Sequence, residues 1–246
     1  MSVLPDRDRA LAVIGGTMLS SAGMEMAALI GGEIVASGSV LLTGGRCGAG
    51  EQASLGAARQ CRKLGIPIDQ RVFAVVPFGI EPDFRDECAV VHAGKDRFER
   101  SMVLMNRARV AFVIGGGRGT KNEVMHAAVE YYMAWGSADV LPVAGTGGVA
   151  DEIIQKVHGY KEDDLNDPAP SLHKARLLMK CAESGTRWLR LDEVWGIDVH
   201  GAFPRDDDPD PVVRRFSRIR HYPYGRIRIE GEDGAQQSAA PEAPNG

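Results

Sequence analysis

Short apolar runs alternate along the chain with longer segments in which apolar residues recur every three or four positions. The short runs predict β-strands at residues 11–14, 40–43, 72–76, 89–92, 110–114 and 140–144. The helical spacing predicts α-helices at residues 23–36, 49–64, 98–107, 120–135, 149–157 and 172–182. Such alternation is typical of βα units joined by right-handed crossovers. We therefore expect an α/β fold, a Rossmann-like, doubly wound, mostly parallel sheet flanked by helices.

The alternating pattern ends well before the C-terminus, and the chain divides accordingly. Residues 1–200 are expected to form a single Rossmann-like domain, with a polar loop at 161–170. Residues 201–229 form a basic extension with Tyr222 and Tyr224, which could touch nucleic acid. Docking on the acidic body or on another subunit is the favoured use of this extension. Residues 230–246 are rich in Glu, Gln, Ser, Ala, Pro and Gly, which predicts a disordered tail.

Composition narrows the class of protein. The net charge of −4 over 246 residues does not mark a nucleic-acid binder. No apolar run is long enough to span a bilayer, and the N-terminus has no signal-peptide core, so we expect a cytoplasmic protein without a membrane partner. The cysteines and histidines lack the spacing of a zinc site, and the cysteines suggest no disulfide framework. We expect neither a metal nor a cofactor.

Four glycine clusters directly follow predicted strands, at residues 15–16, 44–45, 115–119 and 145–148. In an open α/β sheet, ligands bind outside the carboxyl ends of the strands, near the point where the strand order reverses. The clusters therefore predict a shared crevice against which a ligand lies closely, although ordinary βα turns would give the same pattern. The candidate nucleotide-binding residues outside the longest cluster are Gly15, Gly16, Gly44, Gly45, Gly145, Thr146 and Gly147.

The longest cluster has the form of a strand, a tight turn and a helix N-terminus, which favours an anion. Its candidate phosphate-binding residues are Gly116, Gly117, Arg118, Gly119 and Thr120. Thr120 and Glu123 also fit a capping box, so Glu123 has a purely structural alternative. The dinucleotide-binding GxGxxG, the P-loop and the GxSxG nucleophile elbow are all absent. Hydride transfer and ATP hydrolysis on those templates are therefore disfavoured.

The stretch from Gly115 to Glu123 resembles the PGGxGTxxE motif of the LOG family, within the SLOG superfamily of nucleotide-binding proteins. The turn after Thr43 looks like the family's GGxxG turn, and Val72 to Pro77 resembles the family's next strand. Arg100 lies where the family places its catalytic arginine. The resemblance covers residues 11–132, about half of the chain. It departs from the family at Gly115, which replaces the motif's proline, and at Ser101, which replaces a basic residue.

The resemblance implies a SLOG-type fold, homo-oligomers and cleavage of a purine nucleoside 5′-monophosphate to free base and ribose 5-phosphate. Glu123 and Arg100 would be the catalytic residues. The transition state of this cleavage is oxocarbenium-like, and a carboxylate near the ribose can stabilise its charge. A guanidinium can hold phosphate or donate to the departing base. For Arg100, a surface charge on a helix is the structural alternative.

The second half of the domain favours another function. Residues 143–151 look like the Gly-Thr-Gly and Ala-Asp signature of SLOG-type ligand sensors. The alternative is therefore a non-catalytic sensor that binds a nucleotide-derived signal and controls assembly or a partner. Asp151 either complements a helix dipole or binds a ribose hydroxyl, and Arg118 either reaches a second phosphate or is a solvated loop residue. His126 is expected to be a structural histidine.

Overall fold

The computed structural model describes residues 4–132 and 138–184. Its centre is a six-stranded sheet in the order β4-β3-β2-β1-β5-β6, with every neighbouring pair parallel. The strands are β1 (Ala10–Gly15), β2 (Val40–Thr43), β3 (Val72–Val76), β4 (Ala89–His92), β5 (Val110–Ile114) and β6 (Asp139–Pro142). The first four strands extend in one direction from β1, and the chain then returns to place β5 on the other side of β1. The strand order thus reverses between β1 and β5.

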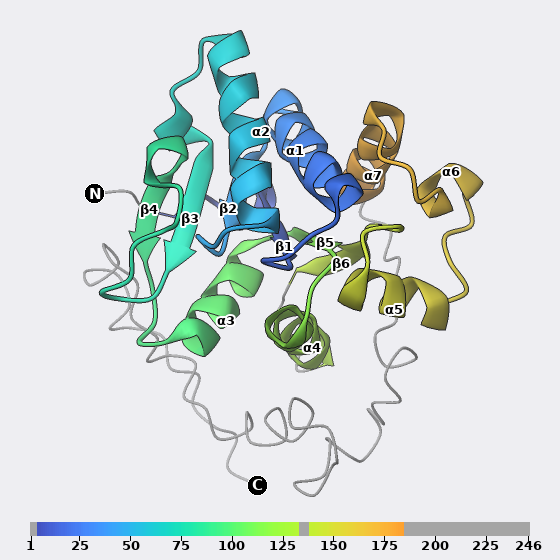
Figure 1. Cartoon of the computed structure of the whole chain (residues 1–246). Coiled ribbons are helices and arrows are strands. Elements are labelled where there is room, and N and C mark those ends of the chain that lie inside the picture. The colour runs from blue at the N-terminus through green and yellow to red at the C-terminus, as the bar shows by residue number, and fades with distance from the viewer. Residues whose placement is uncertain (1–3, 133–137, 185–246) are drawn as a thin grey trace, which may run out of the picture.

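Helices cover both faces of this sheet (Figure 1). One face carries α1 (Ser21–Ala36), α2 (Ala49–Leu64) and α7 (Leu172–Ser184). The opposite face carries α3 (Arg97–Arg107), α4 (Arg118–Tyr132) and α5 (Gly148–Lys156). The short α6 (Asp163–Asn166) lies between α5 and α7 in the chain. The result is a three-layered, Rossmann-like α/β fold, as predicted.

The sequence of the central strands explains this layering. All residues of β2, β3 and β5 are buried, and β1 is buried except for an intermediate Gly15. A parallel sheet covered on both faces requires such continuous apolar runs. Side chains of alternate strand positions pack into two separate cores, one under α1, α2 and α7 and the other under α3, α4 and α5. The strand ends are left for the site.

Helices α1 and α2 pack backbone against backbone. A Cβ atom at Gly31 would overlap the carbonyl of Ala53, and one at Gly56 would overlap the carbonyl of Ala28. The alanines of α2 at positions 49, 53 and 57 are fully buried in the same core. The alanine-rich helix therefore packs within its own chain, and so do Met102 to Met105 of α3. Both segments thus contribute to the cores of the domain.

The predicted elements agree with the structure, apart from shifts at the ends of some elements and one short helix that was not predicted. Helix α4 begins at Arg118 rather than at residue 120, so Thr120 is its third residue and does not cap it. Strand β6 lies at Asp139–Pro142 rather than at the predicted 140–144, because the chain already turns at residues 144–145. The predicted loop at 161–170 contains α6. The C-terminal end of the predicted helix 120–135 and the whole of the basic extension and the tail lie outside the described residues.

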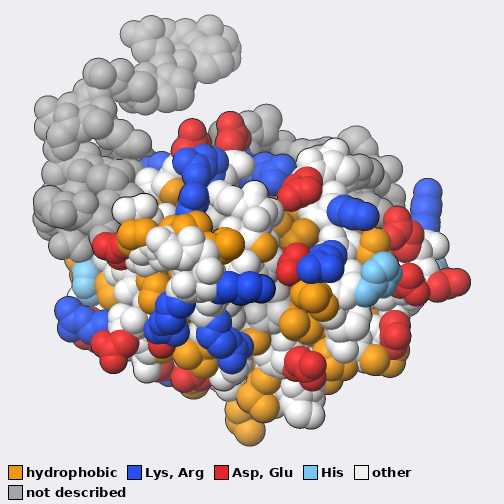
Figure 2. Space-filling model, turned by 90° about the horizontal axis from the view of Figure 1, so that it is seen from above, with side chains coloured by type: hydrophobic (Ala, Val, Ile, Leu, Met, Phe, Trp, Pro, Cys, Tyr) orange, Lys and Arg blue, Asp and Glu red, His pale blue; other side chains and the backbone are white. Residues whose placement is uncertain are grey.

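The surface shows the mixture of basic, acidic and apolar residues that the composition indicates. Seen from the side of α1 and α2, basic and acidic side chains are mixed with small apolar groups (Figure 2). Among the described residues, no helix is long and apolar enough to cross a membrane.

Adjacent glycines of α1 allow a test of the α1–α2 contact. Replacing Gly31 with alanine should lower the free energy of unfolding by about 1–3 kcal/mol, because the added methyl overlaps the backbone of α2. Replacing Gly32 with alanine should raise it by about 0.5–1 kcal/mol, because its Cβ would meet nothing nearer than the Gly56 carbonyl at 3.6 Å and alanine favours a helix. Urea unfolding of both variants measures the difference. Equal effects of the two substitutions would contradict the proposed close contact.

Candidate functional site

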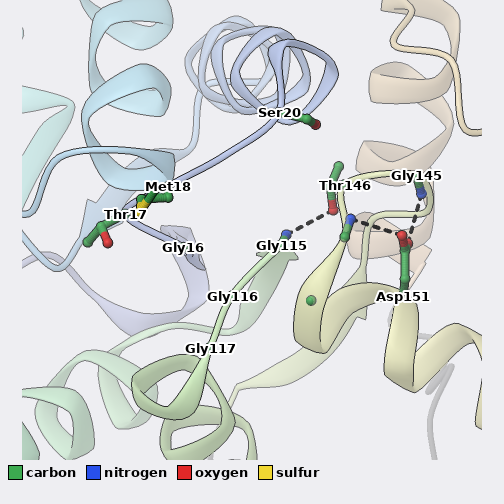
Figure 3. Close-up of a pocket in the computed structure, with 12 residues that line it drawn as sticks. Gly16, Thr17, Met18, Ser20, Gly115, Gly116, Gly117, Gly145, Thr146 and Asp151 are labelled. Carbon is green, nitrogen blue, oxygen red and sulfur yellow. Dashed lines mark hydrogen bonds between the residues drawn. The ribbon is translucent and has the colours of Figure 1, made fainter.

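Two adjoining cavities lie at the carboxyl ends of β1 and β5, where the strand order reverses. The first, of about 400 Å³, contains four arginines and one carboxylate, and we call it the basic cavity. The second, of about 620 Å³, is lined mainly by glycines, and we call it the glycine cavity (Figure 3). Both are lined by Gly16, Thr17 and Gly117, so they form two halves of one crevice. This is the position expected for a ligand in an open α/β sheet.

An ion pair lies at the inner end of the basic cavity. Nη1 of Arg100, on α3, donates to Oε1 of Glu123, on α4, at 3.1 Å. Each residue is only 7% exposed. Glu123 therefore does not cap α4, and Arg100 is no surface charge. The structure brings together the two residues that the motif singled out, although they lie 23 positions apart.

Ser101 completes the surroundings of Glu123. Its hydroxyl lies 2.9 Å from Oε1 of Glu123 and 2.8 Å from the backbone carbonyl of Arg97. Because a hydroxyl has one proton, it donates to only one of these oxygens at a time. The other oxygen of Glu123, Oε2, has no hydrogen-bond partner among the described residues, and Glu123 lines the cavity. One carboxylate oxygen is thus held, while the other is left without a hydrogen bond in a residue that lines the cavity.

Gly44 makes room for the arginine. A Cβ at this position would overlap the guanidinium of Arg100, so only glycine lets the side chain lie against the end of β2. Gly44, which the sequence analysis predicted to bind the nucleotide, therefore has the structural role of leaving space for the Arg100 side chain. Gly45 has a positive φ of 67° and packs against Val76 and Pro82, which is a structural role.

Burial changes the protonation of the pair. Removal from water raises the pKa of Glu123 above its ordinary value, and this outweighs the opposing influence of Arg100 and Ser101. Burial likewise lowers the pKa of Arg100, although a guanidinium stays charged in proteins. Nε of Arg100 is buried without a hydrogen-bond partner among the described residues. Burial of this pair therefore lowers the stability of the folded protein, as burial of charged functional groups often does.

The N-terminus of α4 differs from those of the other helices around the crevice. The first amide of α2 donates to the Gly16 carbonyl, and Ser20 caps α1. Two amides of α5, those of Val149 and Ala150, donate to carbonyls of the β5–α4 turn. The amides of the first three residues of α4, Arg118, Gly119 and Thr120, have no hydrogen-bond acceptor among the described residues. The amides of a first helical turn have no partner within the helix, so this end can bind an anion.

Gly117 and Gly119 at this end of α4 have no structural need to be glycine. Neither has a positive φ, and a Cβ at either position would meet no atom within 4 Å. Both line the basic cavity. By contrast, Gly116 has a φ of 107° and a Cβ there would press on Thr120. The absence of side chains at Gly117 and Gly119 therefore leaves room for a ligand to approach the backbone.

Several polar groups that line the glycine cavity are used in contacts within the protein. Asp151 accepts hydrogen bonds from the amides of Gly145, at 2.8 Å, and Gly147, at 2.9 Å (Figure 3). Thr146 accepts from the amide of Gly115 and donates to the carbonyl of Val143. These three predicted nucleotide-binding residues line the cavity, but their polar groups are already used. Asp151 thus binds its own loop and occupies the place of an anion there.

The described structure gathers the other predicted residues at the crevice too. Gly15, Gly16, Arg118 and Thr120 line the basic cavity, with Thr120 turned onto Gly116 and 3% exposed. The sequence did not identify Thr17, Arg46, Arg97 and Ser101 as site residues, although all but Ser101 line the basic cavity. One signal was available for Arg97, since it lies one helical turn before Arg100. No group of three or more metal-binding side chains occurs among the described residues.

His126 lies behind the site rather than in it. It is 1% exposed, and its Nε2 lies 3.1 Å from Oδ1 of Asn106. Burial lowers its pKa to about 3, so the ring is neutral at neutral pH. This agrees with the structural role expected from the sequence.

The buried histidine makes stability depend on pH. Between pH 7 and pH 5 the unfolded chain gains a proton at His126, with its ordinary pKa of about 6.5, while the folded chain does not. The free energy of unfolding should therefore fall by about 2 kcal/mol more in the wild type than in His126→Gln over this interval. Denaturant unfolding at both pH values measures this. Parallel pH profiles of the two proteins would contradict the assignment.

Comparisons with known proteins agree with the fold. No protein-family model matches the chain, and no curated protein matches it by sequence. An X-ray structure of the protein TM1055 superposes with a TM-score of 0.51 and 23% identity, covering 70% of this chain and 99% of that one. The molybdenum cofactor binding protein from the phototrophic bacterium Rippkaea orientalis gives 0.50 and 22%, covering 70% and 95%. At these identities the likeness shows the shared Rossmann-like α/β fold.

Proposed function

We propose that this chain binds a nucleoside 5′-monophosphate in the crevice and hydrolyses its N-glycosidic bond. The observation that carries the proposal is the position of two features in one cavity. The open N-terminus of α4 supplies amides for a phosphate, and the Arg100–Glu123 pair supplies a carboxylate held in place by a guanidinium. The resemblance to the LOG motif supports the same reaction.

The phosphate would lie on the first turn of α4. The amides at Gly117 and Gly119 and the helix dipole favour a dianion there, and the absence of side chains lets it approach the backbone. The ribose would then lie toward Glu123, farther along α4. The base would extend along the crevice toward Gly16 and Thr17, which line both cavities.

Glu123 would act through its open oxygen. As the bond between C1′ and the base breaks, Oε2 faces the growing positive charge of the ribose and orients a water molecule. The water oxygen bonds to C1′, and the departing base takes up a proton, so that free base and ribose 5-phosphate result. Arg100 holds Oε1 and keeps the carboxylate in place. The ionised carboxylate is the active form, so activity should rise with pH through a pKa above the usual glutamate value.

Turnover can be tested on the carboxylate itself. The purified protein should release free base from AMP, and Glu123→Gln should lose this activity by a factor of about 100 or more, because the amide cannot stabilise the cationic ribose. Chromatography of the base measures release. Glu25→Gln, which changes an exposed carboxylate of α1, is the matched control and should keep full activity. Absence of release by the wild type, or equal release by Glu123→Gln, would exclude hydrolysis.

A second candidate is binding of a nucleotide-derived ligand without turnover. The likeness of fold to the molybdenum cofactor binding protein supports this, as does the glycine cavity, which extends the crevice beyond the basic half. In that case isothermal titration with a nucleotide would show tight binding, and chromatography would detect no released base. Homo-oligomers and a cytoplasmic location, both expected from sequence, remain part of the proposal.

Both candidates require an anion at α4, and one position tests it. Gly119→Asp should weaken phosphate and AMP binding by roughly tenfold or more, because the new carboxylate repels the ligand. The thermal midpoint should stay equal or rise, since aspartate in a first helical turn is favourable. Gly119→Ala, whose methyl group meets open space, should bind within a few-fold of the wild type. Unchanged binding by Gly119→Asp in isothermal titration would place the anion elsewhere.

A further inference from the structure

We propose that Arg97 and Arg118, together with Arg46, form a second anion-binding subsite at the mouth of the basic cavity. The ligand would then carry a second anionic group besides the phosphate on α4. This inference rests on the proposed nucleotide binding and extends it to a ligand class, nucleotides with two phosphoryl groups.

The three arginines come from three separate segments that meet at one cavity. Arg46 lies in the turn between β2 and α2, Arg97 is the first residue of α3, and Arg118 is the first residue of α4. Arg97 and Arg118 are exposed, and neither has a carboxylate within ion-pair distance among the described residues.

Arg46 is held in position by the neighbouring loop. Its Nε lies 3.7 Å from a carboxylate oxygen of Asp83, too far for a strong hydrogen bond. The same oxygen accepts from the amide of Cys47 at 2.7 Å, and the amide of Asp83 donates to the carbonyl of Gly45 at 3.0 Å. Asp83 therefore fixes the turn firmly while neutralising its arginine only in part.

The charge of the cavity exceeds what one phosphate requires. Its lining contains four arginines and one glutamate, a formal charge of +3. Arg100 is paired with Glu123, which leaves for the ligand the two exposed arginines, Arg97 and Arg118, and Arg46, whose charge Asp83 neutralises only in part. A single phosphate carries about −1.5 to −2 at neutral pH and would be met first by the amides of α4. A second phosphoryl group would balance the remaining positive charge.

The electrostatic interactions agree with this placement. Arg46 and Arg97 both lower the pKa of Arg100, because like charges near a guanidinium disfavour its charged form. Each of them is thus close enough to Arg100 to repel its charge. A bound polyanion would relieve this repulsion, and a planar guanidinium is suited to bind phosphate with two hydrogen bonds.

Inorganic anions test the subsite without any glycosidic bond to break. By isothermal titration, pyrophosphate should bind the wild type roughly tenfold more tightly than orthophosphate. Arg97→Gln/Arg118→Gln should reduce this preference to less than about threefold. Arg59→Gln/Lys63→Gln removes the same charge from exposed positions of α2 and should keep the preference. Thermal unfolding should show that all variants fold alike.

A second arm identifies the arrangement of the two groups. Competition by ADP and by adenosine 3′,5′-bisphosphate, measured against AMP, distinguishes adjacent phosphoryl groups from separated ones, and tighter binding of either than of AMP supports the subsite. Equal binding of orthophosphate and pyrophosphate, or a preference that survives in the double variant, would overturn the subsite and leave the phosphate site on α4 intact. If no phosphate compound binds the wild type, the proposed function fails as well.

Discussion

The crevice depends on backbone segments that approach one another more closely than any side chain would allow. At Gly15 a Cβ would overlap the carbonyl of Ile114, at Gly48 that of Gly16, and at Gly148 that of Gly116. These contacts join the loops after β1, β2, β5 and β6 into one unit. Because each loop is held by its neighbours, the cavity walls are set by the strands and do not depend on a ligand to shape them.

The buried Arg100–Glu123 pair is the feature that stability alone does not explain. Taking two charges out of water costs several kcal/mol, and a pair of this kind is weak evidence for a stabilising role. The partnerless Nε of Arg100 adds to that cost. The rest of the fold offsets it with two continuous apolar cores on either side of the sheet. Such local violations of packing rules occur at functional sites.

The sequence predicted the sheet and the placement of the site better than the contacts within it. Apolar runs gave the strands, and parallel strand ends must meet at one edge, so the glycine clusters had to converge. The roles of Gly44 and Asp151 were not predictable, because they depend on side-chain positions across segments far apart in the chain. The same holds for Ser101, which the motif comparison marked only as a departure. The start of α4 at Arg118 was missed because Thr120 offered an equally good capping signal.

The residues at the first turn of α4 have a consequence for how such a protein can change. A Cβ at Gly117 or Gly119 would meet no atom within 4 Å, and Arg97 and Arg118 are exposed side chains that line the basic cavity. The groups that select a ligand are thus separate from the groups that hold the fold. Ligand preference can drift in a lineage through a few exposed substitutions without loss of the scaffold. Proteins with this architecture can therefore share a shape at low sequence identity and still serve different small molecules.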